Sequence, residues 1–342
     1  MISPLSDSDS LTPAELAETS HWIRSVQGLD GGIPWDLGQQ LDPWDHVEAA
    51  MGLDVAGAHE AAAAAYRWSR ARQRTDGSWA AGYRGDQVCA DFVDVNFCAY
   101  IATGTWHHFL VTGDTEFLRC MWPTVVDAID FTIAQQTGDG TVNWALDANG
   151  KAWPQPLLTS CCSIYLSLRS AMRIAEELGF ACASWQRGAA RLGIAIRQRP
   201  RAFLPKHRYA MDWYYPVLAG LLDAPAAVRR IERCWDVFVV EGAGVRCVSD
   251  RPWVTVAETC ELVVALTALG WADEAARLFD WVRQQRCSDG SYWTGFTVPD
   301  GVPWPEERTT WTAGAVLLAA AALDGDDAVT GLFRLQDPAQ DP

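Results

Sequence analysis

Hydrophobic and polar positions alternate with a helical period over most of the chain. In one set of segments, apolar residues recur every three to four positions and charges occupy the opposite face, as in residues 58–73, 114–136 and 272–285. A second set, such as residues 95–111 and 310–323, is apolar on nearly every side. An amphipathic helix buries one face, whereas a helix that is apolar all round is enclosed on all sides. The pattern therefore predicts outer helices and inner helices.

The two kinds of segment alternate six times along the 342 residues. Six outer and six inner helices predict an all-α fold, an (α/α)6 toroid or six-hairpin barrel. The toroid is expected to form a single domain over residues 1–342, with short flexible ends at about 1–10 and 333–342. We expect no β-strands apart from short pieces such as GVRCV at residues 244–248.

A repeated phrase marks the ends of the hairpins. QRTDGSW spans residues 73–79, and QRCSDGSYW spans residues 285–293. Asp-Gly favours a tight turn, because glycine adopts positive φ at little cost. Each phrase is therefore expected to end an outer helix and begin a long connection to an inner helix. These connections share one face, the mouth of the toroid, where function is expected.

Composition narrows the classes of function. The net charge is −16, and no basic tract is present. Such a chain is a poor ligand for nucleic acid or an anionic membrane. The N-terminus does not look like a signal peptide, and no apolar run is long enough to span a bilayer. The ten cysteines lie mostly in apolar helical runs and form no CxxC pair, so we expect free thiols and a cytoplasmic protein.

Aromatic and charged residues gather in the predicted connections, which hold many of the 18 tryptophans. Indole walls beside carboxylates and arginines suit a sugar, whose CH face stacks on the ring, or a carbocation. The expected substrate-binding residues are Trp44, Glu48, Trp79, Tyr83, Arg208, Asp212, Trp213, Tyr214, Arg246, Trp253, Glu261, Trp293, Trp304 and Glu306. The same connections also hold Asp42, Asn96, Thr159, Ser160, Tyr209, Tyr215 and Trp311. A tryptophan in such a connection is also often a plug that seals the end of a hairpin.

Carboxylates are the strongest catalytic candidates, because glycoside hydrolysis needs one protonated acid and one ionised base or nucleophile. The expected catalytic residues are Asp94, Glu307, Asp45 and Glu258. Asp94 or Asp45 is expected to act as the acid and Glu307 as the base, while Glu258 and Glu261 hold hydroxyl groups. An acid in the first turn of a helix also serves simply to stabilise the helix dipole.

No metal or cofactor site is predicted. His46 and His207 are the histidines on the predicted mouth face, and no HExxH motif or Cys/His cluster has ligand spacing. No P-loop, GxSxG or GxGxxG motif opens a helix after a strand.

The QRTDGSW phrase resembles the repeat motif of terpenoid cyclases and protein prenyltransferases, which also build α/α toroids. This resemblance implies an isoprenoid substrate. The Asp-x-Asp-Asp acid motif of the protonation-initiated cyclases is absent, and the nearest phrase is DFVDVN at residues 91–96.

A second resemblance is to six-hairpin glycosidases such as the glucoamylase-like enzymes. The phrase GDTEFLRCMWPTVVDAIDF at residues 113–131 and the alternation of outer and inner helices carry it. By hairpin count, the resemblance implies a catalytic base at Glu306 or Glu307. At the position of the acid it implies Asp147, while related toroid enzymes use an aspartate at the second inner helix, which implies Asp94.

The sequence thus predicts a carbohydrate-active enzyme, a glycoside hydrolase with paired carboxylates in the toroid mouth and a small sugar-like substrate. The mouth is expected to hold numerous charged groups. Because stray carboxylates quench a carbocation, these groups favour a polyhydroxylated substrate. A terpenoid cyclase or prenyltransferase-like enzyme acting on an isoprenoid is the first alternative. A non-catalytic toroid that binds a ligand or a partner protein is the second.

Overall fold

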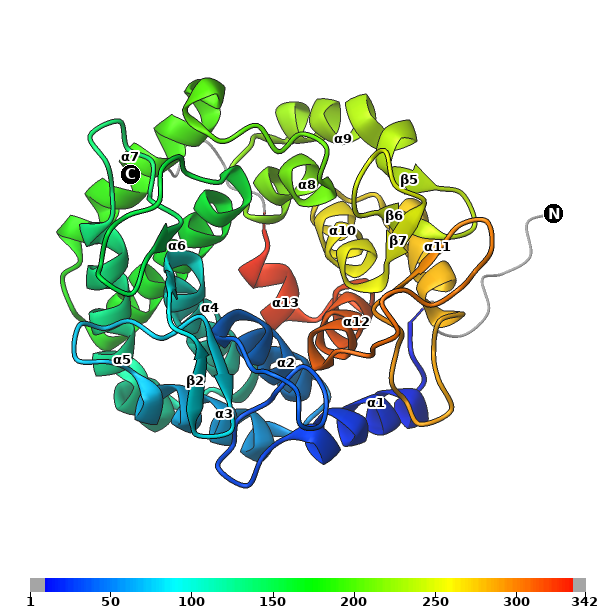
Figure 1. Ribbon diagram of the computed structural model, residues 1–342, viewed down its shortest axis with the longest axis horizontal. Helices are drawn as coiled ribbons and strands as arrows, with labels where there is room; N and C mark the ends of the chain where they lie inside the picture. Colours follow the sequence, from blue (N-terminus) through cyan, green and yellow to red (C-terminus); the bar gives the residue numbers. More distant parts are fainter. Residues whose placement is uncertain (1–9, 335–342) are drawn as a thin grey trace.

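The computed structural model describes residues 10–334 and shows two concentric rings of helices (Figure 1). The outer helices are α1 (Pro13–Val26), α3 (His59–Arg72), α5 (Thr115–Ala134), α7 (Ala183–Gln198), α9 (Ala224–Phe238) and α11 (Ala272–Arg283). The inner helices are α2 (Pro43–Val55), α4 (Val95–Thr112), α6 (Leu158–Leu178), α8 (Ala210–Leu218), α10 (Val256–Ala268) and α12 (Thr310–Leu323). The predicted (α/α)6 toroid is confirmed.

The inner ring is closed by its first and last members. Each inner helix packs against the next one in sequence, and α12 packs against α2. At this seam the two backbones touch, since a Cβ added to Gly52 would lie 2.6 Å from the Cα of Gly314. Glycine at both positions allows an approach that a larger side chain would prevent.

The repeated glutamine and the Asp-Gly turn join neighbouring hairpins. Gln73 Nε2 donates to the carbonyl of Gly77 in its own turn, at 3.1 Å, and to the carbonyl of Thr124 in α5, at 2.9 Å. Gln136 makes the equivalent pair of bonds to Gly140 and Gly188. Gly77 has φ +89°, which confirms the predicted turn geometry. The repeat is therefore part of the scaffold and stitches each outer helix to its neighbour.

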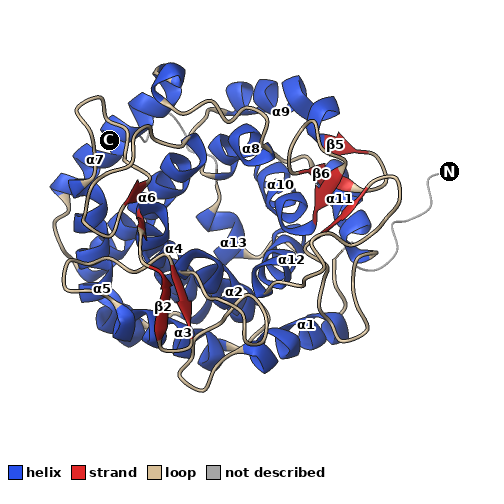
Figure 2. Ribbon diagram, viewed as in Figure 1, coloured by secondary structure: helices blue, strands red, loops and turns tan. Residues whose placement is uncertain are grey.

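Short strands lie over the mouth, mostly in the outer-to-inner connections (Figure 2). They are β1 (Gly82–Arg84), β2 (Gln87–Ala90), β3 (Val93–Asp94), β4 (Ala145–Leu146), β5 (Val239–Val240), β6 (Gly244–Arg246), β7 (Trp253–Thr255) and β8 (Gly295–Thr297). β1 pairs with β2, β3 with β4, and β5 to β8 form an antiparallel sheet in chain order. β6 coincides with the predicted piece, and the other strands are additions that are too short to show a period of two.

Two further elements complete the described chain. The 3₁₀ helix η1 (Pro200–Ala202) follows α7, and α13 (Asp327–Leu332) packs against α4, α10 and α12 inside the inner ring (Figure 1). At the inner edges of the predicted flexible ends, Ser10 and Phe333 are both buried, and the flexible ends themselves stay a prediction. The remaining residues of those ends lie outside the described range.

Candidate active site

A pocket of about 340 Å³ opens at the mouth of the toroid, and we call it the mouth pocket. The first turns of α2, α4, α6, α8 and α12 and the segments just before them form most of its wall. Its lining residues are Trp44, Asp45, Asp94, Asn96, Phe97, Leu157, Thr159, Ser160, Lys206, Tyr209, Met211, Asp212, Tyr215 and Trp311. Helix N-termini provide free NH groups and partial positive charge, which suits a site built around carboxylates.

Asp42 anchors the α2 side of the pocket. Its Oδ1 accepts from the backbone NH groups of Trp44 and Asp45 at 2.9 Å, and its Oδ2 accepts from Trp35 Nε1 at 2.6 Å. With both oxygens engaged, Asp42 is the N-cap of α2. Burial, together with the Asp42 charge, holds the pKa of Asp45 well above its usual range. Both effects favour the protonated form of Asp45, which is the form that can donate a proton.

Asp94 faces the same pocket from the N-cap of α4. Its Oδ1 accepts from the backbone NH groups of Asn96 and Phe97 at 2.9 and 3.3 Å. Burial raises the pKa of Asp94 to about 7, against the effect of these two hydrogen bonds. Near neutral pH Asp94 is thus partly ionised, which makes it a candidate for the base.

A third carboxylate, Asp212 on α8, completes this layer. Its Oδ1 accepts from the Thr159 hydroxyl at 2.8 Å, and Arg230 Nη2 donates to its backbone carbonyl at 2.6 Å. Burial raises the pKa of Asp212, although the hydrogen bonds from Thr159 and the charge of Arg230 oppose the rise. Asp212 is held in a fixed position, as an oxygen that binds a substrate hydroxyl must be.

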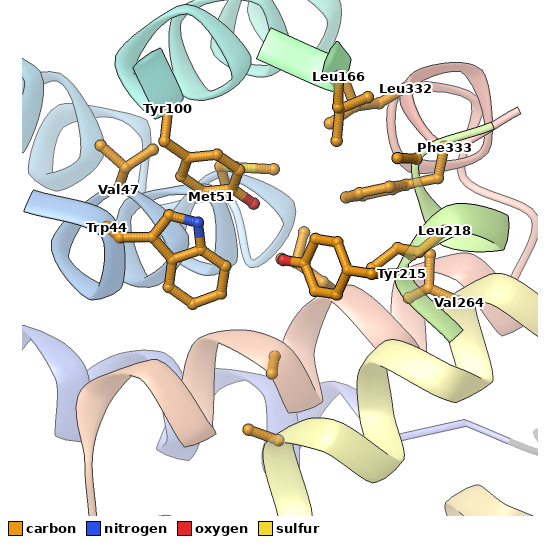
Figure 3. Close-up of a cluster of buried hydrophobic side chains, with 14 of the residues drawn as sticks. Trp44, Val47, Met51, Tyr100, Leu166, Tyr215, Leu218, Val264, Leu332 and Phe333 are labelled. Carbon is orange, nitrogen blue, oxygen red and sulfur yellow. The ribbon is translucent and has the colours of Figure 1, made fainter. Parts of the chain in front are cut away.

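Two buried glutamates lie beneath the mouth pocket. The Tyr100 hydroxyl donates to Glu48, and the Tyr214 hydroxyl donates to Glu261. Burial raises the pKa of Glu48 to about 7, and burial together with the Glu48 charge raises the pKa of Glu261 well above its usual range. Figure 3 shows the hydroxyl ends of Tyr100 and Tyr215 pointing into the centre of the ring, where Tyr100 and Tyr215 line a small cavity with both glutamates. These glutamates form the floor of the site.

Tryptophans form one wall of the pocket. The Trp44 ring stacks on Tyr100 with centroids 5.0 Å apart, and Trp311 meets Trp44 edge-on at 5.6 Å. Trp44 Nε1, Trp311 Nε1 and Asn96 Oδ1 are buried without a hydrogen-bond partner among residues 10–334. Polar groups that are buried and unsatisfied cost free energy, so their presence around one pocket is a feature expected of a polar ligand site.

Three of the predicted binding aromatics lie in the core instead. Trp79 is 2% exposed and donates its Nε1 to the carbonyl of Ser69 at 2.8 Å, while the Tyr83 hydroxyl accepts from the Ala80 NH at 2.9 Å. Trp213 stacks on Phe238 with centroids 5.2 Å apart. None of the three is among the lining residues of the mouth pocket, and their expected contact with substrate stays a prediction.

Other predicted residues lie on the rim around the mouth. Trp304 is 54% exposed and meets Trp253 edge-on at 4.8 Å, above the β5–β8 sheet. Arg308 lies over the Trp293 ring, and Arg208 pairs with Asp250 at 2.5 Å.

Four more predicted residues, among them the predicted base Glu307, lie outside the mouth pocket. Arg246 donates to the carbonyl of Ser249 at 3.1 Å. Glu306 is exposed, and half-burial with the nearby Asp36 charge raises the pKa of Glu307. Glu258 is buried, where Thr255 and Cys247 donate to it. None of these four groups is among the lining residues of the mouth pocket.

Several residues that line the mouth pocket or the small cavity beneath it were not predicted from the sequence. Phe97, Tyr100, Leu157, Lys206 and Met211 fall inside apolar helical runs or in a short loop before α8. Tyr100 lies four residues after Asn96, one helical turn deeper on the same face, which was the available signal. Phe97, Leu157 and Met211 show no pattern distinct from ordinary core residues, and Lys206 is a single charged residue in a loop.

No group of three or more His, Cys, Asp and Glu side chains within residues 10–334 has an arrangement that holds a metal ion. In the same range, every helix is too short or too polar to cross a bilayer.

The fold has solved counterparts among sugar-converting enzymes. A wild-type glycosidase matches 92% of this chain and 99% of its own with a TM-score of 0.71 at 17% identity. A D-mannose isomerase gives a TM-score of 0.71 at 11% identity, covering 94% and 100% of the two chains. Cellobiose 2-epimerase from Spirochaeta thermophila gives 0.68 at 12% identity, covering 92% and 96%. At these identities the likeness establishes the fold.

A closer relative identifies the chemistry. No family model matches the chain. The MMP endo-(1,4)-3-O-methyl-alpha-D-mannosidase of Mycolicibacterium hassiacum is 49% identical over 324 residues, which cover 95% of this chain and 90% of the relative. This relationship confirms the predicted resemblance to six-hairpin glycosidases and favours it over the isoprenoid enzymes. The protein belongs to the family of this mannosidase and is a glycoside hydrolase.

Proposed function

We propose that the protein is an endo-acting α-mannosidase that cleaves 1,4-linkages inside a chain of 3-O-methylated mannose residues. The observation that carries the proposal is the mouth pocket, which Asp45 of α2 and Asp94 at the start of α4 both line. The mannosidase that is 49% identical to this chain supplies the substrate class. The pocket opens on the broad face of the ring, which leaves room for sugar units on both sides of the bond that is cleaved.

Methylation of the sugar fits the chemistry of the pocket wall. Phe97, Leu157 and Met211 line the pocket together with the tryptophan rings. An unmodified mannose presents hydroxyl groups that an apolar wall does not satisfy, whereas an O-methyl group gains about 0.8 kcal/mol when its carbon is buried.

In the proposed mechanism, Asp45 carries the proton for the leaving group. Burial and the neighbouring Asp42 charge favour its protonated form, and it protonates the glycosidic oxygen as the bond to the anomeric carbon breaks. Asp94, once ionised, acts on the anomeric carbon directly or through a water molecule. Asp212 and Asn96 hold hydroxyl groups, and the Trp44 ring supports the face of the sugar.

The test is hydrolysis of a 1,4-linked 3-O-methyl-α-mannan with mass spectrometry of the products. Internal fragments of several units are expected first, whereas release of single sugars alone, or no cleavage, would overturn the proposal. Asp45→Asn and Asp94→Asn are each expected to lower kcat/KM on the order of 1000-fold. Glu307→Gln is the comparison, because Glu307 is the base expected from the sequence. If Glu307→Gln abolishes turnover while Asp94→Asn does not, the second role belongs to Glu307.

The location of the protein and its lack of affinity for nucleic acid stay predictions. The second of these rests on the net charge of −16.

A further inference from the structure

A second cavity adjoins the mouth pocket on its α8 side. It has a volume of about 780 Å³ and lies between the segment after η1, the start of α8 and one face of α9. Lys206 and Asp212 line both cavities, so the second one continues outward from the site of the proposed reaction. Clefts that bind small molecules have volumes of about 300–1,000 Å³, and this cavity lies within that range.

The charge of this cavity is opposite to that of the chain. Arg201, Lys206, Arg229, Arg230 and Arg233 line it, in a protein whose net charge is −16, and we call it the arginine groove. Asp212 is the acid among its lining residues, and the Thr159 hydroxyl already donates to that carboxylate. The groove therefore holds a local excess of positive charge.

The scaffold does not account for two of these arginines. Arg229 and Arg233 are four residues apart on α9, on the same side of the helix, where like charges repel. Within residues 10–334 neither makes a hydrogen bond or an ion pair with a carboxylate. Arg230, by contrast, is part of the wall, since its Nε and Nη2 donate to the carbonyls of Trp213 and Asp212. The guanidinium NH groups of Arg229 and Arg233 are thus available to a ligand, next to a wall that the hydrogen bonds of Arg230 hold in place.

Two stacked aromatic rings form a rigid floor of the arginine groove. Trp213 and Phe238 stack with an interplanar angle of 17°, and the Trp213 indole donates to the carbonyl of Arg230 at 2.9 Å. Phe203 closes the groove from the η1 side. Guanidinium groups around a rigid aromatic floor recognise planar or tetrahedral oxyanions through paired NH donors.

We propose that the arginine groove binds a carboxylate or phosphate anion next to the catalytic pocket. Two sources of that anion have the same chemistry: an acidic group on the carbohydrate chain, or a free small anion. Only the first source rests on the proposed function. A long polyanion is disfavoured, because it would meet the negative field of the rest of the molecule.

Binding is measured first, by titration calorimetry with pyrophosphate and with a 1,4-linked 3-O-methyl-manno-oligosaccharide oxidised to the aldonate at its reducing end. The double variant Arg229→Gln/Arg233→Gln is expected to bind whichever probe the wild type binds about tenfold more weakly. The control is Arg24→Gln/Arg187→Gln, which removes the same charge from exposed positions on α1 and α7 and is expected to bind as the wild type does. The inference is overturned if the wild type binds neither probe, or if both double variants bind equally well.

Cleavage then separates the two sources. The ratio of kcat/KM for the aldonate to that for the matching neutral alditol cancels any general loss of activity. A ratio of about ten in the wild type that falls to about one in the groove variant assigns the anion to the substrate. Pyrophosphate binding with a ratio near one in both proteins assigns the groove to a free anion. If the wild type binds a probe but cleaves neither oligosaccharide, the proposed function is contradicted and the anion site is still supported.

Discussion

At the scale of single residues, burial decides which carboxyl groups carry protons. Asp45 and Glu48 are three residues apart on α2, and Asp94 caps α4. Burial raises the pKa of all three, although the hydrogen bonds and neighbouring charges that act with it or against it differ at each site. Sequence spacing identified the acids at the starts of inner helices. It did not show that Glu48 lies below the pocket or that Glu307 lies outside it, because both facts depend on contacts between distant segments.

The pH profile of the enzyme follows from Asp94. Because its pKa is raised to about 7 and the base must be ionised, kcat/KM is expected to rise as the pH increases through about 7. Burial and the Asp42 charge raise the pKa of Asp45 as well, which favours the protonated form that the acid requires. Initial rates from about pH 5 to about pH 9 test this. An acidic limb near pH 4 would contradict the assignment of Asp94.

Glu48 gives a prediction about stability. Its pKa is about 7 in the folded protein and 4.5 when unperturbed, so the folded state holds the proton more tightly. The free energy of unfolding therefore decreases as the pH rises between these values, by about 3 kcal/mol in total. Glu48→Gln keeps an acceptor for the Tyr100 hydroxyl without the charge.

Urea denaturation is expected to show Glu48→Gln more stable than the wild type at about pH 8 and close to it at about pH 4. Glu60→Gln, on the exposed start of α3, is the control and is expected to change little at either pH. A Glu48→Gln variant that is less stable at about pH 8 would refute this account of burial.

At the scale of elements, the hairpin and its Asp-Gly turn form the repeating unit. The helical period predicted each outer and inner helix, since these run for at least nine residues and show a clear periodicity. It did not predict α13 or most of the strands, because segments of two to six residues are fixed by the contacts around them. Trp79 shows the same limit, since its sequence neighbours fit a mouth residue and a plug equally well.

The turn at Gly77 is expected to tolerate no side chain. A Cβ there would lie 2.2 Å from the carbonyl oxygen of Asp127, in addition to the cost of φ +89°. Gly77→Ala is therefore expected to destabilise the protein by roughly 3 kcal/mol or more. Gly85→Ala is the matched control, since Gly85 also has positive φ but no atom within 4 Å of the added Cβ, and a cost of about 1 kcal/mol is expected. If urea denaturation shows that both variants lose the same free energy of unfolding, the positive φ sets the cost and the contact with Asp127 does not.

At the scale of the whole molecule, the toroid is open at the mouth and filled near its axis. Phe333, which follows α13, is 4% exposed and lines the small cavity below Glu48 and Glu261 (Figure 3). Phe333→Ala is expected to lower the free energy of unfolding by about 3 kcal/mol, because it leaves a cavity beneath the active site.

Phe180→Ala is the control for Phe333→Ala. Phe180 is 52% exposed and stacks on Trp122, so a loss of about 1 kcal/mol is expected. Thermal unfolding of both variants measures the difference. Similar melting temperatures would show that Phe333 contributes no more than a surface ring.

The contact between Gly52 and Gly314 has a consequence for how the protein is made. α2 belongs to the first hairpin and α12 to the last, so the seam between them cannot form until nearly the whole chain has been synthesised. Before that point, α2 has an exposed apolar side facing an absent neighbour, and the growing chain is an open arc with two uncovered ends. Closing the arc is expected to be a late and slow event in biogenesis, and the interval before it is when the nascent protein is most exposed to aggregation and most dependent on chaperones.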